Sequence, residues 1–199
     1  KHGDARALML ALDAKYPEVR LLPDSEQARA TAAGLVAWLD DRVGPDIRRA
    51  LYFEILPHAG WVSRLFSGGL PGWAQSAYGL VFRGVAPVMR RMMKIYPEPS
   101  ARSLARLEEA ADRIHRLTQA TGYLVGERLT VADLTAASLL YPLALPNEYP
   151  YPSPEPMPAP MQAWLARWAE HPTTAWVREI YRRHRPPSRA INEAPPASA

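Results

Sequence analysis

Apolar residues recur along this 199-residue chain at the three- and four-residue spacing of an α-helix. No run alternates apolar and polar residues as a half-buried strand does, and no Asn-Gly or Asp-Gly pair marks a β-hairpin. The pattern therefore predicts an all-α fold, a bundle of five to seven helices preceded by one separate helix. The clearest stripe lies within 100–121 and consists of Leu104, Leu107, Ala111, Ile114 and Leu117.

Capping residues, glycines and prolines set the expected boundaries. Ser25 is a natural N-cap, and Gly44-Pro45 is expected to kink or break the helix that follows it, because proline removes a backbone donor. Glycines crowd residues 59–78, for which we expect an irregular conformation. Eight prolines within 142–160 predict an extended loop over the surface. The expected helices span residues 4–15, 25–43, 47–56, 80–96, 100–121, 130–143, 161–170 and 173–183.

Composition narrows the classes of protein that fit. Hydrophobic residues make up 48% of the chain and charged residues 22%, which is enough apolar material for a core. The lack of cysteine excludes disulfides and thiolate chemistry, and the five histidines lack metal-ligand spacing, so we expect no metal. No stretch reaches the roughly 18–20 apolar residues of a membrane span, and we expect no membrane contact. The net charge of +4 is spread along the chain and does not predict a nucleic-acid partner.

The most informative motif is the run Leu-Thr-Val-Ala-Asp at 129–133. With Thr130 as N-cap, Asp133 falls at the third helical position, and the two residues make a capping box. In such a box each side chain accepts a hydrogen bond from the other residue's backbone N–H. Leu129 and Leu134 occupy the positions of a hydrophobic staple. We expect Thr130 and Asp133 to be structural, because the cap occupies the carboxylate that acid–base catalysis would need.

This box resembles the signature of the glutathione transferase family, in which Leu-Thr-x-Ala-Asp opens a buried helix of the all-helical second domain. The resemblance covers residues 4–185 and implies a glutathione transferase C-terminal-like helical domain at 18–185. Residues 1–17 would be the last helix of a thioredoxin-like domain, and 186–199 a flexible tail. The supporting likenesses are Leu22-Pro23-Asp24, Arg29-Ala30 and Trp38-Leu39-Asp40 at the start of the domain, and Ala163-Trp164, His171-Pro172 and Tyr181-Arg182 near its end.

The resemblance also implies an activity. Family members join the thiol of glutathione, their co-substrate, to apolar electrophiles, and a Tyr, Ser or Cys in the thioredoxin-like domain activates that thiol. The catalytic residue would then lie upstream of this chain, which alone is expected to be inactive. Asp4 matches the acid that holds the γ-glutamyl end of glutathione, and Ala5 replaces the hydroxyl residue beside it. We further expect the longer protein to be a cytoplasmic homodimer.

Candidate substrate-binding residues follow the Gly44-Pro45 pair. Arg48, Arg49 and Tyr52 lie on the helix from which the family usually lines its pocket for the acceptor substrate, a small apolar electrophile. The tyrosine could donate a hydrogen bond to a bound product and an arginine could hold a carboxylate. The alternative is a pair of solvated arginines beside a half-buried tyrosine. A set of aromatic residues either walls this pocket or packs in the core or at an interface: Trp61, Phe66, Trp73, Tyr78 and Phe82.

Two functional hypotheses follow from the sequence. The first is a glutathione transferase-like enzyme in which this chain supplies the acceptor pocket. The alternative is a non-catalytic helical protein-interaction module, because the same domain serves in the family as an assembly platform.

Overall fold

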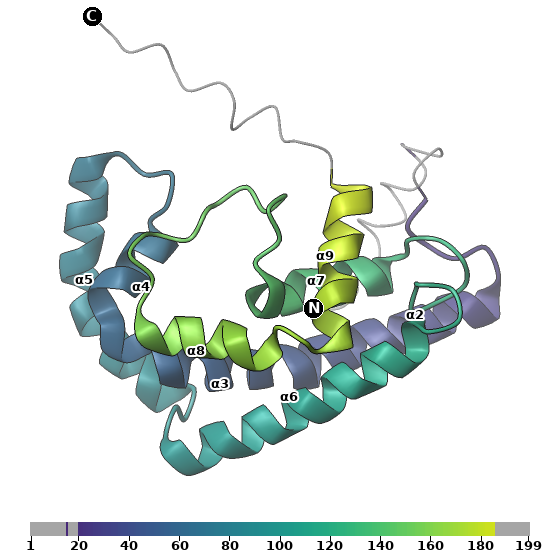
Figure 1. Cartoon of the computed structure of the whole chain (residues 1–199), viewed down its shortest axis with the longest axis horizontal. Coiled ribbons are helices and arrows are strands. Elements are labelled where there is room, and N and C mark those ends of the chain that lie inside the picture. The colour runs from purple at the N-terminus through teal and green to yellow at the C-terminus, as the bar shows by residue number, and fades with distance from the viewer. Residues whose placement is uncertain (1–14, 16–19, 186–199) are drawn as a thin grey trace, which may run out of the picture.

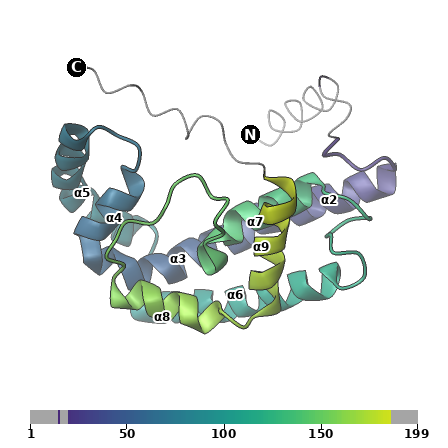
Figure 2. The same ribbon diagram turned by 45° about the horizontal axis from the view of Figure 1, so that its top comes forward.

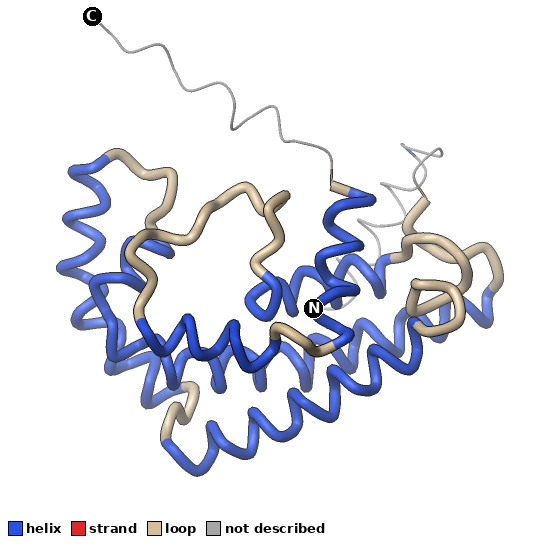
Figure 3. Tube along the Cα trace, viewed as in Figure 1, coloured by secondary structure: helices blue, strands red, loops and turns tan. Residues whose placement is uncertain are grey.

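The computed structural model describes residue 15 and residues 20–185, and all regular structure in these residues is helical (Figures 1 and 3). The all-α class expected from the apolar spacing is thereby confirmed. Asp4, nearly all of the segment at 1–17 and the tail at 186–199 lie outside the described residues.

The helices follow one another with short connections except after α6 and after α7. In chain order they are α2 (Glu26–Trp38), the π-helix η2 (Leu39–Val43), α3 (Gly44–Ile55), the 3₁₀-helix η3 (Leu56–His58), α4 (Ala59–Phe66), α5 (Gly72–Met92), α6 (Pro97–Thr118), α7 (Val131–Ala144), α8 (Ala159–Trp168) and α9 (Pro172–His184).

The chain passes from α2 through η2 into α3 in helical conformation throughout. Ser25 caps α2, since its hydroxyl accepts a hydrogen bond of 3.1 Å from the Ala28 N–H. The irregularity expected at Gly44-Pro45 lies in the preceding five residues instead, as the π-helix. Pro45 stands in the first turn of α3, where a missing N–H leaves no hydrogen bond unmade.

Residues 59–78 differ from the irregular segment that their glycines predict. They form α4 and the first part of α5, and only the turn between these helices is non-helical. Gly69 in that turn has a φ of +85°, which suits glycine. Gly60 and Gly72 occupy the first turns of α4 and α5, where the backbone loses little by having glycine. The glycines therefore correctly indicated one turn, but they led us to miss α4 and the first part of α5, whose later part agrees with the helix expected at 80–96.

Helices α3 and α7 lie at the centre of the packing. Helix α3 contacts α6, α7 and α8, and α7 contacts α2, α8 and α9. Helix α7 continues through Pro142 to Ala144, so the proline-rich loop begins later than expected and covers 145–158. The fully buried side chains at these contacts include Leu39, Ile55, Leu107, Ile114, Leu140, Leu143 and Val177.

Helices α4 and α5 form an arm at one end of the molecule, with α2 at the other end (Figures 1 and 2). Helix α5 packs chiefly on α4, to which it turns the buried Phe82. We call residues 59–96 the α4–α5 arm. None of the described helices combines the length and the apolar character needed to cross a membrane.

Candidate functional site

The start of α7 carries the capping box that the sequence predicts, with both of its reciprocal bonds present. The Thr130 N–H and hydroxyl donate to one oxygen of the Asp133 carboxylate, at 2.8 and 2.7 Å. The Leu124 N–H donates to the other oxygen at 2.6 Å. Asp133 is fully buried. Burial raises the pKa of this carboxyl, and the hydrogen bonds from Leu124 and Thr130 oppose that rise. These hydrogen bonds give the Asp133 carboxylate a structural role at the start of α7.

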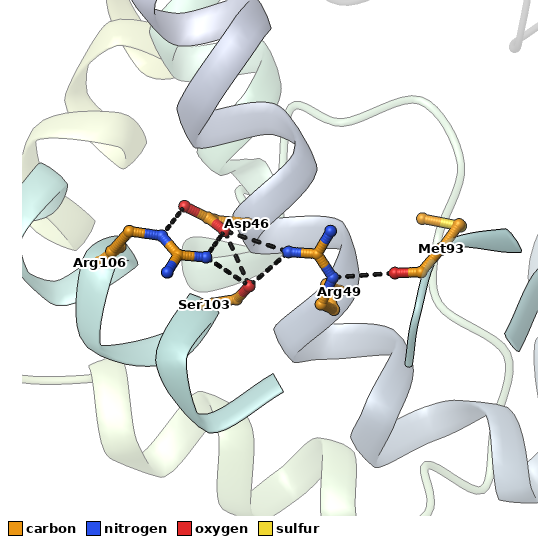
Figure 4. A network of polar contacts seen from close by, with 5 residues as sticks. All are labelled: Asp46, Arg49, Met93, Ser103 and Arg106. Carbon is orange, nitrogen blue, oxygen red and sulfur yellow. Dashed lines mark hydrogen bonds and ion pairs between the residues drawn. The ribbon is translucent and has the colours of Figure 1, made fainter. Parts of the chain in front are cut away.

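Arg49 ties α3 to α6 instead of facing open solvent (Figure 4). Its Nε donates to the Met93 carbonyl at 2.8 Å, and its Nη1 donates to the Ser103 hydroxyl at 2.8 Å. Arg49 and Ser103 both contact the buried Asp46, whose carboxylate lies 3.4 Å from Arg49 Nη1 and accepts from Ser103 at 2.7 Å. It also accepts from Arg106 at 2.6 and 2.8 Å. This paired Arg106–carboxylate geometry is the strong form of an ion pair. We call Asp46, Arg49, Ser103 and Arg106 the Asp46 network.

The partners of Asp46 stabilise the ionised form of its carboxyl group. Burial alone would raise the pKa of Asp46, but hydrogen bonds from Arg106 and Ser103 and the charges of Arg106 and Arg49 outweigh it and lower the pKa. The spacing of Asp46 and Arg49 by three residues was a signal for this pair, because residues at i and i+3 share a helix face. Arg106 lies 60 positions away, and no local pattern could have indicated it.

Arg48 and Tyr52 lie one turn apart on the other side of α3. Arg48 is exposed and, among the described residues, has no hydrogen bond or ion pair. The Tyr52 ring packs edge-on against Phe66 of α4, with 6.0 Å between ring centroids. Burial raises the pKa of Tyr52, and the positive charge of Arg48 works in the opposite direction. The two residues thus place an unengaged cation beside a phenol that stays protonated at neutral pH.

The five aromatic residues that the sequence suggested for the pocket wall or the core lie in different environments. Phe66, Tyr78 and Phe82 pack together, with ring centroids 5.8 Å apart for the two phenylalanines and 6.0 Å apart for Tyr78 and Phe82. Trp61 is buried under the proline-rich loop and donates its indole N–H to the Pro154 carbonyl at 2.7 Å. Trp73 points outward and is 78% exposed. Four of the five therefore pack against other parts of the chain, and Trp73 is exposed to solvent.

A group of tyrosines that sequence reasoning missed lies between α7, the proline-rich loop and α9. Tyr149 stacks on Tyr141 at 4.3 Å between centroids and meets Tyr151 and Tyr181 edge-on at 6.0 and 6.5 Å. The Arg185 guanidinium lies over the rings of Tyr149 and Tyr181 at 6.0 and 5.9 Å. We call Tyr141, Tyr149, Tyr151 and Tyr181 the tyrosine cluster. Its members come from three separate segments, so spacing along the chain gave no sign of it.

Tyr141 has the most strongly perturbed phenol of this cluster. Burial raises the pKa of Tyr141, and its neighbours Tyr149, Tyr52 and Tyr181 raise it further. On α3, Arg48 and Tyr52 could donate hydrogen bonds to an anion or to a carbonyl oxygen.

A small pocket lies where α3, α4 and the proline-rich loop meet. Its walls include Leu51, Ile55, Trp61, Tyr141 and Tyr149, and its volume is about 20 Å³. That is room for about one water molecule, whereas small-molecule sites usually enclose ~300–1,000 Å³. This pocket alone cannot hold an electrophile, so a substrate would need an open face of the domain.

Trp61→Phe tests what holds the proline-rich loop in place. The change keeps an aromatic ring and removes the one hydrogen bond to Pro154. A single such bond contributes about 1 kcal/mol, so we expect loop opening, and limited proteolysis within 145–158, to become roughly fivefold faster. Trp73→Phe is the matched control because its indole is exposed. Equal cleavage rates for the two variants would contradict a pinning role for Trp61.

Within the described residues, no group of three or more His, Asp or Glu side chains is placed to hold a metal ion. Comparison with protein-family models, with curated proteins and with solved structures finds no match to this chain.

Proposed function

We propose that this chain is the helical domain of a glutathione transferase-like protein, and that Arg48 and Tyr52 face its acceptor substrate. The observation that carries the proposal is the pair itself, an exposed arginine without a partner among the described residues beside a protonated phenol on α3. The buried box of Thr130 and Asp133 supports it, since this motif is the one that resembles the family. We do not include Arg49 in the proposed pocket, because its guanidinium is hydrogen-bonded within the Asp46 network and to the Met93 carbonyl.

The proposed chemistry is attack of a glutathione thiolate on an apolar electrophile. The sulfur forms a bond to the electrophilic carbon, and the displaced electron pair goes to a leaving group or to an electron-withdrawing group. Arg48 and Tyr52 would stabilise that negative charge, the first by its cation and the second by donating a hydrogen bond. The thiol itself would be activated by a residue of the thioredoxin-like domain. The protein would act as a cytoplasmic homodimer.

The decisive experiment assays thiol conjugation with an apolar aryl halide, using the 199-residue chain and a longer protein that includes a thioredoxin-like domain. We expect turnover from the longer protein and none from the chain alone. Turnover by the chain alone would overturn the assignment of the nucleophile to another domain. Failure of the longer protein to bind glutathione at millimolar concentration in calorimetry would overturn the enzyme hypothesis.

Arg48→Gln in the longer protein tests the acceptor pocket. We expect kcat/KM for the electrophile to fall roughly 10- to 100-fold, as for loss of a charge-assisted hydrogen bond, while the affinity for glutathione is unchanged. Arg42→Gln is the matched control, since Arg42 is exposed on η2 and has no partner among the described residues. An equal loss in both variants would show that general surface charge, and not Arg48, causes the effect.

The alternative, a non-catalytic interaction module, is favoured by a different observation. The α4–α5 arm exposes an unusual number of large apolar side chains, Trp73 and Met92 most of all at 78%. The glutathione calorimetry separates the two hypotheses, because a module needs no affinity for that thiol.

A further inference from the structure

The exposed large apolar residues of this protein are concentrated in the α4–α5 arm. Of the twelve such residues in the described part of the chain, nine lie within 66–96. Trp73 and Met92 are 78% exposed, and Leu80 and Val81 are 69% and 65% exposed. Single exposed apolar residues are ordinary, but such a concentration is typical of a surface that binds a protein, a membrane or a ligand.

All charged residues of the α4–α5 arm are basic. Between Glu54 and Glu98 the chain contains no acidic residue. Within the arm the cations are Arg64, Arg83, Arg90, Arg91 and Lys94. These five positive charges exceed the formal net charge of +4 of the whole chain. The rest of the chain therefore carries a small net negative charge. Basic residues are spread along the whole chain, and the arm differs from the rest by its lack of acidic residues.

The outward face of α5 carries both properties. A helix turns by about 100° per residue, which places Trp73, Leu80 and Val88 on one side and the buried Phe82 on the opposite side. Arg83 and Arg91 border or interrupt the exposed apolar side. Helix α5 lies along the outer end of the molecule (Figures 1 and 2), and its exposed apolar residues extend from Trp73 to Met92.

We propose that the outward face of α5 binds an anionic lipid surface, lying in the plane of the membrane interface. Exposed Trp, Leu and Val together with Arg alone as the charged residue are the composition of interfacial helices. Trp73 and Leu80 would enter the boundary between headgroups and acyl chains, and Arg83 and Arg91 would pair with lipid phosphates. A helix that lies on a bilayer needs no apolar span, so this contact agrees with the lack of any spanning helix among those described. The proposal departs from the expectation of no membrane contact, which was based on the lack of a spanning segment in the sequence.

A lipid surface fits the outward side of α5 better than the protein partner that the interaction-module hypothesis would place on this arm. The outward side of α5, about 30 Å long and about 10 Å wide, offers only a few hundred Å². A stable protein interface buries about 800 Å² on each partner and needs a complementary groove. A bilayer accepts a convex apolar helix of any outline, and its phosphates match a face without acidic residues. The inference is independent of the proposed enzymatic function, because no step of it uses Arg48, Tyr52 or glutathione.

The test is co-sedimentation of the 199-residue chain with vesicles of phosphatidylcholine alone or with 30% phosphatidylserine. We expect binding to the anionic vesicles only, weakened by added salt. Trp73→Ser should lower the partition coefficient roughly tenfold, and Arg83→Gln with Arg91→Gln about fivefold for each charge removed. All three positions are exposed, and circular dichroism checks that the variants remain folded.

Matched controls carry the same changes elsewhere. Leu117→Ser removes a 39% exposed apolar side chain from α6, and Arg42→Gln with Arg116→Gln removes two exposed cations outside the arm. These variants should bind as the unchanged chain does. Absence of binding to anionic vesicles would overturn the proposal, as would equal losses in test and control variants. A discrete dimer in light scattering that Trp73→Ser dissolves, without vesicle binding, would assign the face to a second copy instead.

Discussion

Replacing Asp133 with alanine is expected to lower the free energy of unfolding by roughly 3–5 kcal/mol. The carboxylate is fully buried and accepts from the Thr130 N–H and hydroxyl and from the Leu124 N–H. Alanine leaves these three donors without an acceptor in a place that water does not reach, and each unpaired donor costs about 1–3 kcal/mol. Chemical denaturation followed by circular dichroism measures the change.

Two further variants make this prediction specific. Thr130→Ala should cost only about 1 kcal/mol, because the carboxylate still accepts from both backbone N–H groups. Glu127→Ala, a few residues away, should change stability by less than about 0.5 kcal/mol, since Glu127 is exposed and has no partner among the described residues. A loss for Asp133→Ala no larger than that for Thr130→Ala would contradict the joint role of the three donors.

The features that the sequence predicts well are those encoded locally. The capping box joins residues three positions apart, so the run at 129–133 shows it directly. The stripe within 100–121 predicts α6, because helical periodicity is a property of consecutive residues. The bond from Leu124 to Asp133 could not be predicted, since it depends on the turn that brings residues nine positions apart together.

The candidate site shows the limit of such reasoning more clearly. The sequence analysis assigned Arg48 and Arg49 the same role, because both follow Gly44-Pro45 on the helix that the family resemblance implicates in substrate binding. The helix phase separates them: Arg49 points with Asp46 toward α6, and Arg48 points with Tyr52 to the other side. Helix α4 and the first part of α5 were missed because glycine occurs at helix starts as well as in turns, whereas the rest of α5 was predicted by the helical spacing within 80–96.

Asp46→Asn is expected to lower the free energy of unfolding by roughly 2 kcal/mol at pH 7, because hydrogen bonds to a charged group are worth about 1.5–3 kcal/mol and solvent screens the exposed partner. The substitution keeps the size of the side chain but removes the charge that pairs with the half-buried Arg49 and the exposed Arg106. Two guanidinium groups would then lie beside a neutral amide at the contact of α3 with α6. The exposed pair of Glu98 and Arg102 offers the control, and Glu98→Gln should cost no more than about 0.5 kcal/mol.

The pH dependence of this difference follows from the lowered pKa of Asp46. A carboxyl whose pKa is lower in the folded chain than in the unfolded one, where it is about 3.9, stabilises the fold only while it is ionised. The contribution is complete well above pH 4 and disappears as the pH falls through the folded-state pKa. The stability gap between the unchanged chain and Asp46→Asn should therefore be constant from pH 7 to 5 and narrow below pH 4. A gap that stays the same down to pH 2 would mean that the side chain acts by its shape, and that the charge pairing seen in the Asp46 network contributes nothing to holding α3 against α6.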